Sequence, residues 1–188
     1  MRLKKITLVI ILAFLTACAA PLATYHDTEM DFGSVQTVAV MPFANLTGHT
    51  RVEDRVRDVF MNMLLATASI YVIPPGEVAR GISRVQVVDS TSPSAEEIQK
   101  LGVALSADAV ITGVVREYGE VRSGTAASNV ISIGLQMMEV QTGRVIWSGS
   151  TTKGGINLKD RLLGGGGQPM NDITEEAVLD LIHQLFNS

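Results

Sequence analysis

The chain has little cysteine, few aromatic residues and a deficit of basic residues, and each shortage excludes something. The single cysteine among 188 residues cannot close an internal disulfide, and it leaves too few thiolates for a cysteine-rich zinc site. Aromatic residues make up 5% of the chain, so aliphatic residues and methionine must fill the core. The formal net charge of −4 argues against binding to nucleic acid, which favours basic surfaces.

The sequence also has no apolar run long enough to cross a bilayer as a helix, which takes about 20 residues. Its main apolar stretch, residues 6–15, follows the basic residues Arg2, Lys4 and Lys5. A basic head, a short apolar stretch and small residues after it are typical of a secretory signal peptide. We expect residues 1–17 to be removed, which leaves 12 basic and 19 acidic residues and a net charge of −7.

The cysteine stands at the expected cleavage point. The tetrapeptide Leu15-Thr16-Ala17-Cys18 resembles the lipobox of bacterial lipoproteins, in which the cysteine becomes the first residue and carries acyl chains. The alternative is a plain signal peptide followed by an unrelated cysteine. Because two or more acyl chains hold a protein on a bilayer without a spanning helix, the resemblance implies a lipid anchor at Cys18. By resemblance to enterobacterial lipoproteins, Ala19 in place of an aspartate implies the outer membrane and a domain that faces the periplasm.

After the leader, the hydrophobic pattern predicts an α/β fold: one compact α+β domain with a mixed sheet, flanking helices, a late β-hairpin and a C-terminal helix. Residues 18–33 show no sustained period and are expected to form a lipidated tether, so the globular domain spans 34–188. The hairpin places Gly143 at a position that needs a positive φ. The expected order is β-α-β-α-α-β-β-β-α. The strands are expected at residues 35–41, 70–73, 107–115 (with an extension to 118), 131–138 and 144–151, and the helices at 51–67, 76–82, 93–105 and 172–185.

Local signals predict the ends of two helices and one buried side chain. Thr50 and Glu53 form a T-x-x-E capping box for the first helix. Asp172 and Glu175 are expected to cap the last one. Trp147 is the only tryptophan, and of its two possible environments, the core or an exposed sheet edge, the core is favoured.

Residue types that carry chemistry are present, but without the spacing that chemistry needs. His26, His49 and His183 lie far apart, and no partner stands at metal-ligand spacing from any of them. Glycines 164–167 lack the Lys-Ser/Thr of a phosphate-binding loop and are expected to be a linker. No G-x-S-x-G motif surrounds a serine. We therefore expect no catalytic residue, no cofactor and no metal, and a protein that is not an enzyme.

One helix carries a mixed-charge face. Asp54 and Asp58 lie one helical turn apart, and a pair of carboxylates suits acid–base chemistry. Arg51, Arg55 and Arg57 lie among them, however, which favours a solvated face with balanced charge.

Two surfaces are candidates for contact with another protein. The first is the exposed part of that helix face, Arg51, Arg55 and Asp58. The second is the polar segment 119–128, which is expected to be a loop or a hairpin tip. Loops carry binding sites more often than cores do.

Three segments resemble one superfamily of bacterial envelope proteins. "VAVMPFANLTG" (38–48), before an amphipathic helix, and "LGVALSADAVITGVVREYG" (101–119) resemble the amino-terminal domain of TolB-like proteins and the curli secretion lipoprotein CsgG. "LQMMEVQTGRVIWSG" (135–149) resembles the hairpin of the same group and of LpoB-type peptidoglycan synthase activators. The resemblance implies a compact α/β domain on a lipid tether that acts by binding rather than by catalysis.

The resemblance leaves two functions open. The first is an assembly or scaffold component of the envelope, CsgG-like and secretion-linked, that self-associates or docks an envelope protein. Residues 116–130, the only spare segment, are too short and polar to supply the membrane-crossing hairpins of CsgG. The alternative is an LpoB-like regulator that binds and activates a periplasmic peptidoglycan synthase. The expected partners are the membrane, through the lipid on Cys18, and a protein, but not nucleic acid.

Overall fold

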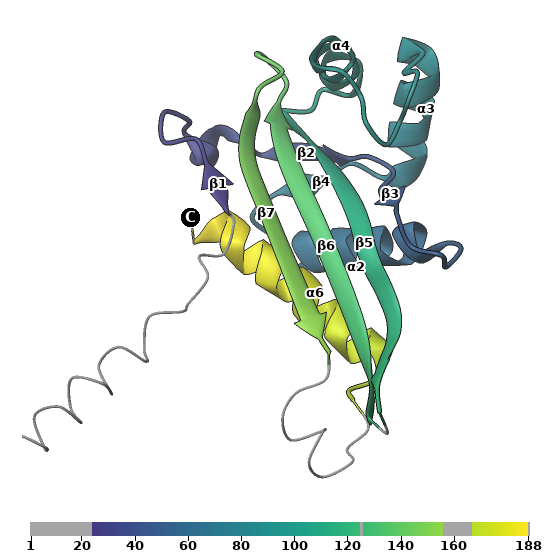
Figure 1. The fold of residues 1–188 in the computed structure, drawn as a ribbon. Helices are drawn as coiled ribbons and strands as arrows, with labels where there is room; N and C mark the ends of the chain where they lie inside the picture. The colour runs from purple at the N-terminus through teal and green to yellow at the C-terminus, as the bar shows by residue number, and fades with distance from the viewer. Residues whose placement is uncertain (1–23, 125, 156–166, 188) are drawn as a thin grey trace, which may run out of the picture.

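A seven-stranded mixed sheet organises the residues that the computed structural model describes, which are 24–124, 126–155 and 167–187 (Figure 1). The strands lie in the order β1-β7-β6-β5-β2-β4, and β3 pairs with β5 beyond β2. The strands are β1 (Tyr25–His26), β2 (Thr37–Val40), β3 (Ala44–Asn45), β4 (Tyr71–Val72), β5 (Ala109–Ser123), β6 (Ala126–Glu139) and β7 (Val145–Gly154). The helices are the 3-10 helix η2 (Phe32–Ser34) and the α-helices α2 (Val52–Ala66), α3 (Pro75–Val85), α4 (Ala95–Leu105) and α6 (Met170–Phe186).

The sheet combines a parallel part with an antiparallel part. β2 runs parallel to both β4 and β5, and β5, β6 and β7 form an antiparallel meander. Helices α2 and α6 pack on one face over the main core, and α3 and α4 pack on the other face over a second core beside β2. Val38 and Val40 enter the first core, whereas Ala39 and Met41 enter the second. The unbroken apolar run of β2 follows from this burial on both faces.

The predicted fold class and element order are confirmed. Without the short elements β1, η2 and β3, the observed order is the expected β-α-β-α-α-β-β-β-α. Trp147 is fully buried, as favoured, and Gly143 has a φ of 70° in the hairpin connection. No helix among the described residues is both long and apolar enough to cross a membrane.

The structure corrects the predicted helix caps. Arg51, not Thr50, is the N-cap of α2; it has a left-handed φ of 62° and makes no side-chain cap. Glu53 instead accepts a hydrogen bond from Asn45 Nδ2 at 2.6 Å, which ties the helix to the preceding loop. The capping box lies on α4, between Ser94 and Glu97.

The last helix also begins earlier than predicted. Pro169 is the N-cap of α6, and the helix starts at Met170. Proline suits the start of a helix because the amide proton that it lacks would have no partner within the helix. Asp172 therefore lies inside the first turn and does not cap it.

The segment 119–128 is a hairpin tip, which is one of the two alternatives that the sequence left open. β5 continues to Ser123 and β6 begins at Ala126, so this segment forms the far end of a long hairpin (Figure 1). The register continues from Gly119 opposite Val130 to Ser123 opposite Ala126. Weak strand propensity is overcome because each strand supplies the other with backbone hydrogen-bond partners.

Part of the predicted tether belongs to the folded domain. Tyr25 and His26 form β1, which pairs with Ser148 and Trp147 at the edge of the sheet. Asp27 is buried, and its carboxylate lies 3.4 Å from the guanidinium of Arg144. Residues 18–23 of the tether lie outside the described residues.

Candidate functional site

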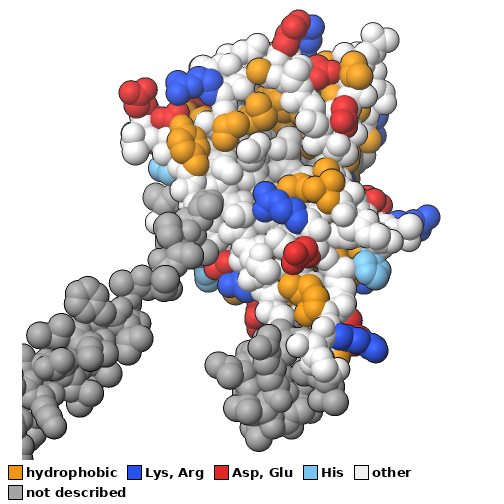
Figure 2. Space-filling view, in the orientation of Figure 1, with side chains coloured by type: hydrophobic (Ala, Val, Ile, Leu, Met, Phe, Trp, Pro, Cys, Tyr) orange, Lys and Arg blue, Asp and Glu red, His pale blue; other side chains and the backbone are white. Residues whose placement is uncertain are grey.

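The antiparallel meander has one open face. The helix α6 crosses its back, and α3 and α4 cover the front only beside β2, so the middle of the meander faces solvent (Figure 1). A groove of about 650 Å³ lies there. Figure 2, which views this face, shows basic atoms near its middle, with hydrophobic atoms beside them and acidic atoms just below. The walls of the groove include the exposed side chain of Leu46 and the segment 91–93 before α4.

Small and uncharged residues line the floor of this groove. In one row across the strands, Thr112 of β5 lies opposite Gln136 of β6, which lies opposite Ser148 of β7. In the next row, Gly134 of β6 lies between Val114 and Ser150. The alternate residues of β6 point the other way, into the main core. The floor therefore offers hydroxyl and amide groups that are exposed to solvent and suited to contact with a polar surface.

A β-bulge brings Arg116 onto the open face. The register of β5 against β6 shifts between Val115 and Glu117, which leaves Arg116 as the extra residue. Bulges commonly redirect a side chain in this way. The guanidinium lies over Gly134, where an added Cβ atom would be only 2.4 Å from Nη2 and 2.8 Å from Cζ. Gly134 has no positive φ, so its role is to leave room for the guanidinium.

The Arg116 guanidinium has no hydrogen-bond or ion-pair partner among the residues that the structure describes. The five ion pairs in those ranges involve other cations: Arg80, Lys100, Arg122, Arg144 and Lys153. Arg116 is also exposed. A guanidinium offers a planar fork of donors that fits a carboxylate with two parallel hydrogen bonds. The site therefore presents a free, oriented cation on an uncharged floor.

A second polar cluster lies between α2 and the long hairpin, on the side of the main core. The ring of His49 meets that of Tyr118 at a centroid distance of 6.2 Å, and Arg55 Nη1 donates to the Tyr118 hydroxyl at 3.3 Å. Asn45 Nδ2 donates to the His49 carbonyl at 2.7 Å, which folds the loop between β3 and α2. The structure thus brings Arg55, one residue of the predicted interaction face, against the long hairpin.

The other residues of that predicted face stay apart from the groove. Arg51 and Asp58 are exposed on α2, and Asp58 accepts a hydrogen bond from Asn62. Arg57 donates to the Val40 carbonyl at the end of β2. Its partial burial lowers the pKa of the guanidinium, while Asp54 and Asp58 oppose that shift. Arg57 therefore leaves the predicted solvated face, whereas Arg51, Arg55 and Asp58 are exposed. Whether these three residues bind a partner stays a prediction.

The three histidines occupy separate structural settings. His26 stacks on Phe32 at a centroid distance of 4.1 Å, and His49 packs against Tyr118. Within the described ranges, no group of three or more His, Cys, Asp or Glu side chains is arranged to hold a metal ion. The predicted lipidation site Cys18 and the glycines 164–166 lie outside those ranges.

Sequence reasoning missed Arg116 and Gly134. The bulge that re-aims Arg116 depends on the pairing of two strands and leaves no mark in the sequence of either one. Gly134 did leave a signal, because a glycine in the middle of an alternating strand often marks a close approach by another group.

The chain belongs to a family of envelope proteins. The profile of the family described as "Peptidoglycan-synthase activator LpoB" matches residues 28–152, more than half of the sequence. This match confirms the LpoB part of the sequence resemblance, whereas the resemblance to CsgG and TolB-like proteins stays a prediction. No curated protein sequence matches the chain.

Solved structures share the fold. The PelC dodecamer from Paraburkholderia phytofirmans matches with a TM-score of 0.57 at 14% identity, over 88% of this chain and 98% of PelC. Lipoprotein GNA1162 from Neisseria meningitidis matches with a TM-score of 0.54 at 21% identity, over 81% of this chain and 99% of that one. The LpoB C-terminal domain from Salmonella enterica matches with a TM-score of 0.51 at 15% identity, over 68% and 87%. At these identities the likeness establishes the fold alone.

Proposed function

We propose that this protein is a lipid-anchored, non-enzymatic lipoprotein of the outer membrane that binds and activates a peptidoglycan synthase from the periplasmic side. The observation that carries the proposal is the family match over residues 28–152, which includes β5, β6 and all but the last two residues of β7. The lipobox at Cys18 supports the anchor. The proposed domain plan is a leader at 1–17, a short lipidated segment from Cys18, and one folded domain.

The structure supports action by contact. The open face carries an unpaired cation and exposed polar groups, and the described residues form no metal-binding cluster. A protein partner that covers this face would bury Arg116 together with the exposed Leu46 on the groove wall. Such a mixture of a charged anchor and an apolar rim is common in protein interfaces.

An activity assay tests this function directly. Each peptidoglycan synthase of the same bacterium is purified in detergent, and its rate of glycan polymerisation is measured with and without the mature protein. We expect the rate of one synthase to rise several-fold, with saturation as the protein concentration increases. An unrelated lipoprotein of similar size and charge is the control. If no synthase responds, the proposed function is wrong.

A second function, an envelope scaffold built by self-association, is favoured by one observation. The PelC structure with this fold is a dodecamer. Light scattering on the lipidated protein in mild detergent separates the two functions. A large oligomer of defined mass would favour the scaffold, whereas a monomer that activates a synthase would favour the regulator.

A further inference from the structure

Arg116 stands out from the other basic residues by the way in which it is held. The exposed cations Arg80, Lys100 and Arg122 each lie near a carboxylate close by in sequence, at 2.5 to 3.9 Å. Surface pairs of this kind contribute little and exchange freely with water. Arg116 has no such partner in the part of the chain that the structure describes, and it rests on a strand instead of extending into solvent.

Two features of the strands determine where the Arg116 guanidinium lies. The bulge after Val115 turns Arg116 toward the open face, and the missing side chain of Gly134 lets the guanidinium lie against the strand. A Cβ atom added to Gly134 would lie 2.4, 2.8 and 2.9 Å from the Arg116 atoms Nη2, Cζ and Nη1, respectively. The guanidinium therefore lies directly over the backbone of Gly134. A preorganised donor pair loses less entropy on binding than a mobile one.

We infer that Arg116, seated on Gly134, is the anchor that receives a carboxylate side chain of the partner protein; this inference rests on the proposed function. Charge complementarity supports this inference, because the chain is acidic and no residue that the structure describes forms an ion pair with this cation. Thr112, Gln136 and Ser150 surround the anchor and offer hydrogen bonds to the same partner. The exposed Leu46 gives the rim an apolar contact, which favours a protein side chain over a small free anion.

Binding of the responding synthase to variants of the mature protein tests this anchor. Arg116→Glu should weaken binding about 100-fold, because it removes the donors and repels the carboxylate. Arg116→Lys should weaken it about tenfold, because the charge remains but the planar fork is lost. Arg84→Glu on α3, an exposed arginine outside the groove lining, is the matched charge control and should leave the affinity unchanged.

Gly134→Ala keeps the Arg116 cation but changes its position, so this variant tests whether the position matters for binding. The new methyl group would displace the guanidinium, which can move away at little cost because it ends a flexible side chain. We expect the variant to fold as stably as the parent and yet bind the synthase several-fold more weakly. Full affinity in both Gly134→Ala and Arg116→Glu would overturn the inference.

A cross-linking experiment keeps the inference testable if no synthase responds. A photo-activated amino acid at Ser150, on the groove floor, is introduced into the full-length protein in living cells. We expect a cross-link to one protein. Arg116→Glu should abolish this cross-link, and changing an acidic residue of that protein to a basic one should restore it. A cross-link that survives Arg116→Glu would overturn it, as would a partner lost only in the Arg51, Arg55 and Asp58 triple-alanine variant. Binding to isolated cell wall that depends on Arg116 would also overturn it, because the carboxylate would then belong to peptidoglycan.

Discussion

At the scale of single residues, glycine positions decide how closely neighbouring elements of this fold can pack against one another. Gly102 lies in α4, where glycine normally costs about 1 kcal/mol relative to alanine. Val140, in the connection between β6 and β7, packs against it so closely that an added Cβ would lie 2.1 Å from Val140 Cγ2. The glycine thus allows the helix to close over the second core, which holds Val140 and the buried helix residue Leu101.

Gly102→Ala should therefore destabilise the protein despite the better helix propensity of alanine. We expect a loss of about 1–3 kcal/mol in the free energy of unfolding, because the methyl group overpacks the contact with Val140. Urea denaturation of the mature protein measures the change. Gly76→Ala in α3 is the matched control, since no atom beyond its immediate neighbours lies within 3.8 Å of that position. It should be neutral or up to about 1 kcal/mol more stable, and equal losses in both variants would refute the packing explanation.

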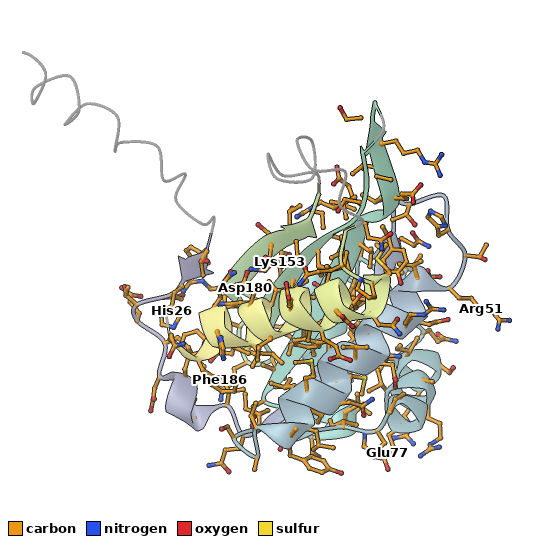
Figure 3. The ribbon with its side chains drawn as sticks, turned by 90° about the horizontal axis from the view of Figure 1, so that it is seen from below. His26, Arg51, Glu77, Lys153, Asp180 and Phe186 are labelled. Carbon is orange, nitrogen blue, oxygen red and sulfur yellow. The ribbon has the colours of Figure 1, made fainter. Side chains whose placement is uncertain are left out.

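At the scale of elements, one polar cluster fastens the last helix to the sheet. Asp180 of α6 accepts a hydrogen bond from Thr151 of β7, and the ammonium of Lys153 lies 3.2 Å from the same carboxylate (Figure 3). Partial burial tends to raise the pKa of Asp180, but these two groups together lower it below its ordinary value. The carboxylate is thus more acidic in the folded protein than in the unfolded chain.

The stability that Asp180 contributes should disappear in acid. Because its folded pKa is lowered, the contribution is complete above the ordinary aspartate value near 4 and is lost as the pH falls through the lower folded pKa. At pH 7 we expect Asp180→Asn to lower the free energy of unfolding by about 1 kcal/mol. The difference between parent and variant should shrink from about pH 5 downward. Urea denaturation at a series of pH values measures it, and a difference that stays constant down to pH 2 would contradict the assignment.

The sequence predicted the long elements well because their periods are strong. The stripe of α2 and the alternation of β6 each place a continuous set of residues in the main core, so their existence and order could be predicted. The ends were less predictable, since the start of α2 depends on Asn45, which binds Glu53 from outside the helix. The sequence left residues 119–128 open between a loop and a hairpin tip, because the pairing between two weak strands outweighs the propensity of either.

The candidate site depended on features that pattern reasoning does not see. Arg51, Arg55 and Asp58 could be grouped because helical spacing alone places them on one face. Arg116 could not be placed, because its direction depends on a bulge formed only when β5 pairs with β6. The middle of the meander is open because α3 and α4 pack only beside β2. The placement of these two helices is set by tertiary packing.

At the scale of the whole molecule, membrane attachment is proposed to depend on a single atom, the sulfur of Cys18. Cys18→Ser should move the protein from the membrane fraction to the soluble periplasmic fraction, because the described residues offer no spanning helix. Fractionation of cells that express each form measures this. The folded domain should keep its stability, which urea denaturation checks. A serine variant that still sediments with membranes would refute the anchor.

The pairing of β1 with β7 also limits how far from the membrane this protein works. Since the folded domain begins by Tyr25, the stretch from Cys18 to Thr24 can span at most about 20 Å. If the proposed anchor and function hold, an activator with so short an attachment would not reach inward to a synthase, and the synthase would have to extend outward to it. The degree of activation would then depend on the distance between the membrane and the cell wall. Lengthening this attachment with a flexible insert should make activation less sensitive to that distance.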